Sequence, residues 1–190
     1  MTRIFVSGIK ESSKDQILDL VLTGSKKILP NFSFIDMKHI IKDAVPKKRG
    51  EIKKTKSFDD FPMEDMIKIK DSINKEISIV LSKTAKKHVI VSGYFTLRTK
   101  AGYAPLFTED VMKKFKPDVI INLELNIHPH DIQKHPENLR LLRHQHANRM
   151  IAFSHSTATG CIVKTIMVQQ NNIKQAIKDL TSSIEFFTGI

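Results

Sequence analysis

The chain has 190 residues, of which 41% are hydrophobic, and it carries a net charge of +11 and a single cysteine, Cys161. This length and hydrophobic share fit one domain with a buried core and exclude a disordered chain. A lone cysteine excludes an internal disulfide, and no apolar run approaches the roughly 18 residues of a membrane span. We therefore expect a cytoplasmic protein with no membrane partner, whose positive charge favours polyanions such as nucleotides or RNA.

Five short apolar runs predict strands at residues 3–7, 32–35, 88–92, 118–124 and 161–168. The run Val119-Ile120-Ile121 is apolar at every position, which is typical of a strand buried on both faces of a parallel sheet. Segments with helical periodicity separate the runs, and this alternation predicts an α/β domain.

Four helices are predicted between and after these strands. The apolar residues that indicate them are Ile17, Leu18, Val21 and Leu22; Met63, Met66, Ile67, Ile73, Ile77, Val80 and Leu81; Leu139, Leu142, Met150 and Phe153 within 137–157; and Ile173, Ile177, Leu180 and Ile184. Gly160 is expected to end the third of them.

In such sheets, ligands bind beyond the carboxyl ends of the strands. Those ends are predicted at Ser7-Gly8, Ser92-Gly93 and Glu124-Leu125-Asn126.

The stretch SGIKESSKD, residues 7–15, lies at the first of these ends. Its Gly8, Ser13, Lys14 and Asp15 follow the spacing of a phosphate-binding P-loop, G-x-x-x-x-G-K-[ST], but Ser13 replaces a glycine and Asp15 replaces the hydroxyl residue. The same letters also fit a helix cap, S-x-x-D, from Ser12 to Asp15, which needs no ligand. Both interpretations remain open from the sequence.

The densest basic run, PKKRGEIKKTK at residues 46–56, includes Lys47, Lys48 and Arg49. Such a run is either a solvated, charged loop or a contact for nucleic acid. No aromatic RNA-binding signature and no zinc-finger spacing accompanies it.

Histidines at 128, 130 and 135 cluster with Asp131 in the segment HPHDIQKHP. Prolines scatter their directions, so we expect a surface loop and no metal site. Cys161 begins an apolar strand and is expected to be a buried small residue.

Two longer stretches resemble the archaeal-type adenylate kinases. Residues 89–107, VIVSGYFTLRTKAGYAPLF, are similar to a strand, a D-T-H triplet and I-[KR]-T-x-x-G-Y-L-P in that family. Residues 144–166, HQHANRMIAFSHSTATGCIVKTI, resemble the family's H-Q-x-x-N-R helix, T-G turn and V-K-I-I strand. The resemblance runs from about residue 86 to the end and extends weakly to the start.

This resemblance implies a three-layer P-loop NTPase-type fold, with about five parallel strands flanked by helices, over a single domain of residues 1–190. It implies a monophosphate-binding insertion at 36–62 and a lid at 126–140 that is shorter than usual. It also implies ATP, ADP and AMP as ligands, Mg²⁺ as cofactor where the protein is active, and association into a trimer.

By the same resemblance, Arg98 holds the phosphate of the monophosphate, while Lys14 and Arg149 are the catalytic cations. Three family features are altered, however. The D-T-H triplet is Ser92-Gly93-Tyr94, an arginine-bearing M-R-K-L-P is Phe58–Pro62, and the lid retains only Lys134 and Arg140 as fixed positive charges. Phosphoryl transfer depends on such charges, so we expect impaired or absent transfer from ATP to AMP. The alternatives are a non-catalytic binding or oligomerisation module and a basic RNA- or ribosome-associated factor.

Overall fold

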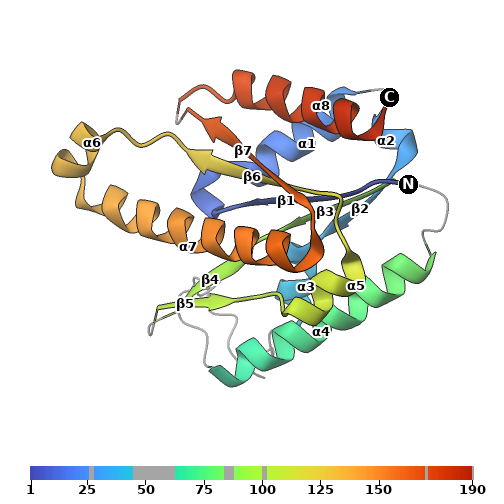
Figure 1. The fold of residues 1–190 in the computed structure, drawn as a ribbon. Coiled ribbons are helices and arrows are strands. Elements are labelled where there is room, and N and C mark those ends of the chain that lie inside the picture. Colours follow the sequence, from blue (N-terminus) through green and yellow to red (C-terminus); the bar gives the residue numbers. More distant parts are fainter. Residues whose placement is uncertain (26–27, 45–62, 84–87, 100–101, 170, 190) are drawn as a thin grey trace.

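The computed structural model describes the chain apart from residues 26–27, 45–62, 84–87, 100–101, 170 and 190. Its central sheet has five parallel strands in the order β2-β3-β1-β6-β7 (Figure 1). They are β1 (Arg3–Gly8), β2 (Phe32–Asp36), β3 (His88–Gly93), β6 (Val119–Leu125) and β7 (Ile162–Val168). All five predicted strands are confirmed, and each end lies within one residue of its predicted place.

The other elements within the described residues are a short 3₁₀ turn, eight helices and a small hairpin. They are η1 (Lys10–Ser12), α1 (Lys14–Gly24), α2 (Ile28–Asn31), α3 (Met37–Ala44), α4 (Met63–Lys83), α5 (Glu109–Phe115), α6 (Pro129–Lys134), α7 (Pro136–Thr159) and α8 (Lys174–Thr188), with the antiparallel strands β4 (Thr96–Thr99) and β5 (Gly102–Pro105). None of the described helices is long and apolar enough to cross a membrane.

Helices cover both faces of the sheet and give three layers (Figure 1). Successive side chains of a strand point to opposite faces. On β1, Ile4 and Val6 therefore pack with α1 and α8, whereas Phe5 packs with α4 and α5. The three inner strands β1, β3 and β6 are mostly apolar because both of their faces are buried, whereas the edge strands β2 and β7 are partly exposed.

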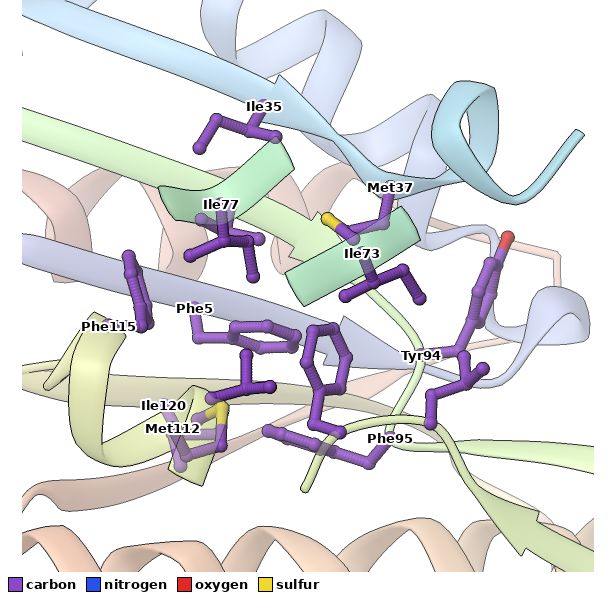
Figure 2. Close-up of a cluster of buried hydrophobic side chains, with 14 of the residues drawn as sticks. Phe5, Ile35, Met37, Ile73, Ile77, Tyr94, Phe95, Met112, Phe115 and Ile120 are labelled. Atoms are coloured by element: carbon purple, nitrogen blue, oxygen red, sulfur yellow. The ribbon is translucent and has the colours of Figure 1, made fainter. Parts of the chain in front are cut away.

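Phe5 lies at the centre of the hydrophobic cluster between the sheet and helices α4 and α5 (Figure 2). Its ring stacks on Phe95 at 4.5 Å between centroids and meets the edge of Phe107 at 5.0 Å. Tyr94 lies at the margin of this cluster, and its hydroxyl oxygen points away from the apolar side chains (Figure 2). The cluster thus anchors Tyr94 and directs its polar end beyond the core.

Helix α7 is confirmed, but it buries a different face from the one that its apolar residues indicate. Met150 is 54% and Phe153 49% exposed, whereas the side chains of Gln145, Asn148 and His155 are buried. Gln145 accepts a hydrogen bond from the Leu125 amide at 2.6 Å and donates one to its carbonyl at 3.2 Å. Polar side chains can line this face because atoms at the end of β6 satisfy them.

Gly160 ends α7 as expected, in the left-handed region with φ of 75°. Cys161 is buried after it, also as expected.

Burial holds the pKa of His155 below its usual value, because the protonated ring would lose its hydration; the charge of Glu109 opposes this only in part. Its Nε2 is buried and has no hydrogen-bond partner among the described residues. The unfolded chain therefore takes up a proton near pH 6.5 before the folded chain does. Stability should fall as the pH is lowered through this range, by about 1.4 kcal/mol for each unit of pKa difference at this one group.

Urea unfolding at several pH values measures this slope. His155→Gln should flatten it, whereas Met150→Gln, an exposed site on the same helix, alters no titratable group and should leave it unchanged. Equal slopes in wild type and His155→Gln would contradict the assignment.

Candidate functional site

The candidate site lies where β1, β3 and β6 end at the same edge of the sheet. Ser7 of β1 is in register with Gly93 of β3 and with Asn122 of β6. Helix α1 begins six residues beyond Gly8, at Lys14. This placement matches the strand end at which the sequence predicts a ligand.

The turn between Gly8 and Lys14 is closed on itself. A Cβ on Gly8 would lie 2.6 Å from both the carbonyl oxygen of Leu123 and Ser12 Oγ, so only glycine fits. Ser12 is fully buried and its hydroxyl donates to the carbonyl of Ile9 at 2.7 Å, while its amide donates to the same carbonyl at 3.0 Å. Gly8 therefore allows the turn to pack against β6.

The predicted cap from Ser12 to Asp15 is wrong. Ser13, not Ser12, is the N-cap of α1; it has φ of 55° in the left-handed region and its side chain makes no capping hydrogen bond. The Ser12 hydroxyl is already bonded within the turn, and the Asp15 carboxylate faces other partners. A serine in this conformation is strained where a glycine would not be.

Lys14 points into the protein, where it is 1% exposed. Its ammonium donates to Ser92 Oγ at 2.6 Å and to Asp15 Oδ1, and it lies 4.7 Å from the ring centroid of Tyr94. The Tyr94 hydroxyl donates to the other carboxylate oxygen, Asp15 Oδ2, at 3.0 Å. Lys38 at the start of α3 lies 3.4 Å from the same Oδ2. These contacts tie together the start of α1, the end of β3 and α3.

Burial and their mutual contacts shift the pKa values of Lys14, Asp15 and Tyr94. Burial lowers the pKa of Lys14, although the charge of Asp15 opposes this effect. Burial alone would raise the pKa of Asp15, but the charge of Lys14 and the hydrogen bonds from Lys14 and Tyr94 together lower it. Burial and the adjacent Asp15 raise the pKa of Tyr94 far above its usual value. Asp15 therefore stays ionised and Tyr94 stays protonated at neutral pH.

A second polar network lies beside the first, at the end of β6. Glu124 is 1% exposed. Its carboxylate accepts hydrogen bonds from Nε of Arg149 at 2.8 Å and from Nη2 of Arg149. It also accepts one from Nδ2 of Asn122 at 2.6 Å. Asn148 donates to Asn122 at 2.9 Å and to Ser7 Oγ at 3.0 Å. The ion pair raises the pKa of Arg149 further, through its hydrogen bonds with Glu124. Arg149 thus holds a buried carboxylate in place.

Arg98 lies on β4, directly opposite Tyr103 of β5 in the hairpin. The Tyr103 ring stacks on His144 of α7 at 5.0 Å between centroids. The sequence did not predict this hairpin, which places Tyr103 beside Arg98. Tyr94 precedes the hairpin, and its hydroxyl donates to Asp15. The role of Arg98 in binding a monophosphate stays a prediction.

Of the predicted site residues, the structure brings Gly8, Ser13, Lys14 and Asp15 into one turn. Lys47, Lys48 and Arg49 lie outside the described residues, so the predicted nucleic-acid contact stays a prediction, as does the trimer. Sequence reasoning missed three contacts: Lys14 with Ser92, Asp15 with Lys38, and Arg149 with Glu124. The one available signal was their position, since Ser92 and Glu124 both lie at strand carboxyl ends.

A protein-family model described as an AAA domain matches residues 25–148, about two thirds of the chain. The matched span begins after the turn that holds Gly8 and Lys14.

Archaeal adenylate kinases are similar over most of their length. The adenylate kinase of Methanopyrus kandleri is 23% identical over 174 residues, which cover 86% of this chain and 90% of that protein. The adenylate kinase of Methanothermobacter thermautotrophicus is 22% identical over 194 residues, which cover 97% of this chain and 100% of that protein.

Solved structures of kinases share the architecture. Thymidylate kinase from Candida albicans aligns with a TM-score of 0.51 at 13% identity, over 97% of this chain and 91% of its own. Shikimate kinase from Bacteroides thetaiotaomicron aligns with the same TM-score and identity, over 100% and 99%. These similarities concern the fold alone, and they confirm the expected three-layer α/β P-loop fold.

Proposed function

Because the chain belongs to the AAA domain family and is a divergent member of the adenylate kinase family, we propose that it binds a nucleotide at the carboxyl ends of β1, β3 and β6 but transfers phosphate from ATP to AMP poorly. One observation carries the second half of this proposal: the ammonium of Lys14 is buried against Ser92 and Asp15. In a P-loop, that ammonium reaches the terminal phosphates.

Phosphoryl transfer asks the protein mainly to align two nucleotides and to neutralise charge. Losing one such electrostatic contact commonly lowers the rate by about 10²–10³. Here Lys14 is engaged by Asp15 and Arg149 is engaged by Glu124, so two cations of the predicted catalytic set already have carboxylate partners.

Mg²⁺ does not fit the described residues of this turn as they stand. Of the two carboxylates within it, Glu11 is exposed, and Asp15 already contacts the ammonium groups of Lys14 and Lys38. Ser92, Gly93 and Tyr94 supply no carboxylate at the end of β3. A metal–nucleotide complex held by Asp15 would require this carboxylate to leave Lys14 first.

On the acceptor side, Arg98 is present at the position that the family resemblance assigns to the monophosphate, whereas the arginine of M-R-K-L-P is replaced within Phe58–Pro62, which lie outside the described residues. We therefore expect AMP to bind with weak affinity and ATP more weakly still. Thermal-shift and calorimetric titrations with ATP, ADP and AMP, each with and without Mg²⁺, measure this order.

Arg98→Ala should weaken AMP binding about tenfold or more, the expected loss of a charge-assisted contact. Arg143→Ala removes an equal charge from the exposed surface of α7 and serves as the control. Equal AMP affinity in wild type and Arg98→Ala would remove the acceptor-site assignment, and a melting temperature unchanged by millimolar nucleotide would contradict the proposal. A single-stranded RNA in the same titration tests the alternative function, because binding through the net charge of +11 should weaken steeply with salt.

A further inference from the structure

The carboxylate of Asp15 has the kind of surroundings that proteins build for an oxyanion. Both oxygens are engaged: Oδ1 by the ammonium of Lys14, and Oδ2 by the Tyr94 hydroxyl at 3.0 Å and the ammonium of Lys38 at 3.4 Å. Two cations and a hydroxyl donor are typical of a site for phosphate or sulfate. Here the anion that fills the set belongs to the chain itself.

Three separate parts of the fold build this arrangement. Lys14 begins α1, Lys38 lies in α3, and Tyr94 follows β3, with its ring anchored in the core (Figure 2). Lys14 is further held by Ser92 at 2.6 Å. A surface ion pair would leave both partners hydrated, whereas Lys14 is 1% exposed and depends on Asp15 and Ser92 for its hydrogen bonds. The contact with Asp15 is therefore firm.

We infer that Asp15 is an internal substitute for a phosphate group, which engages Lys14 and makes the turn reject a free polyphosphate. This inference rests on the proposed function, because it specifies which part of a nucleotide the site refuses. A polyphosphate that approaches Lys14 must displace Asp15 and also meets its negative charge. A monophosphate bound near Arg98 would contact the hairpin of β4 and β5, which does not include Asp15.

Tyr94 acts as a positioning residue in this account. Its hydroxyl holds Oδ2 while Lys14 holds Oδ1, so the carboxylate is fixed by both oxygens. Phenylalanine at this position would keep the ring under Lys14 and remove only the bond to Asp15.

Asp15→Asn is the most direct test, since it keeps the shape of the side chain and removes its charge. Inorganic pyrophosphate, titrated by calorimetry without metal, is the probe. Affinity should rise at least about tenfold, which corresponds to one regained charged contact. Asp19→Asn removes the same charge from an exposed position on the same helix and controls for net charge. Equal pyrophosphate affinity in the two variants would overturn the inference.

Tyr94→Phe keeps the test decisive if Asp15→Asn fails to fold, because it leaves every charge in place. It should raise pyrophosphate affinity about threefold, since a single hydrogen bond to the competing carboxylate is lost. No change from wild type would count against the inference.

AMP separates this inference from the proposed function. AMP affinity of the wild-type protein is measured beside the pyrophosphate affinities of Asp15→Asn and Asp19→Asn. Failure of AMP to bind the wild-type protein would overturn the proposed function, and the pyrophosphate comparison would still decide the role of Asp15.

Discussion

Replacing Arg149 with methionine is expected to lower the free energy of unfolding by about 3 kcal/mol. Glu124 is 1% exposed, and the variant would leave its buried carboxylate without its cation. Removal of one partner of a buried pair typically costs about 3–5 kcal/mol, and the lower end applies because Arg149 itself is 43% exposed. Urea unfolding followed by circular dichroism measures the loss.

Arg143→Met, an exposed arginine on the same helix, is the matched control and should change stability by less than about 0.5 kcal/mol. If Arg149→Met were as stable as this control, the ion pair would have no structural weight.

Asn148→Ala is expected to cost about 2–4 kcal/mol. Its amide joins three segments, because it accepts from the Phe95 amide at 3.0 Å and donates to Ser7 and Asn122. Alanine would leave buried polar groups without partners, and each such group costs about 1–3 kcal/mol. Thermal and urea unfolding of Asn148→Ala measure the cost.

His146→Ala provides the comparison, since His146 is exposed on the same helix two residues earlier. A loss below about 1 kcal/mol in Asn148→Ala, close to that of the control, would show that the network is not needed to hold the ends of β1 and β6 to α7.

The centre of the sheet could be predicted from the sequence because the inner strands β1, β3 and β6 are buried on both faces. Continuous apolar runs such as Val119-Ile120-Ile121 have few other uses in a chain of this composition. Gly160 was equally informative, since a positive φ at a helix end favours glycine. Local patterns of this kind depend only on neighbours in the sequence, so they can be recognised before the fold is known.

The buried face of α7 could not be found in the same way. Asn148 and Gln145 are polar, so hydropathy assigns them to solvent, whereas the exposed Met150 and Phe153 mark the opposite face as the core. What reverses the pattern is a set of hydrogen-bond partners on β1 and β6, distant in the sequence. The hairpin of β4 and β5 was missed as well, because its strands have only four residues each.

The turn at Gly8–Asp15 shows the same limit at the site itself. Two local interpretations fitted its letters, a P-loop and a helix cap, and neither included the contacts of Asp15. Those contacts come from Tyr94 and Lys38, which lie 79 and 23 residues along the chain. Ser13 and Asp15 stand at P-loop positions that normally hold a glycine and a hydroxyl residue, which indicated altered phosphate binding. Only the fold shows that Asp15 forms an ion pair with Lys14.

ADP formation from ATP and AMP with Mg²⁺, measured in a coupled assay, tests the central claim most directly. The purified protein should be compared with the adenylate kinase of Methanothermobacter thermautotrophicus under identical conditions, with a mock purification to subtract host enzyme. With Lys14 held by Asp15 and Ser92, kcat/KM should be at least about 100-fold lower than that of the relative. A kcat/KM within tenfold of that of the relative would contradict the account, because Lys14 would then have to contact the nucleotide phosphates.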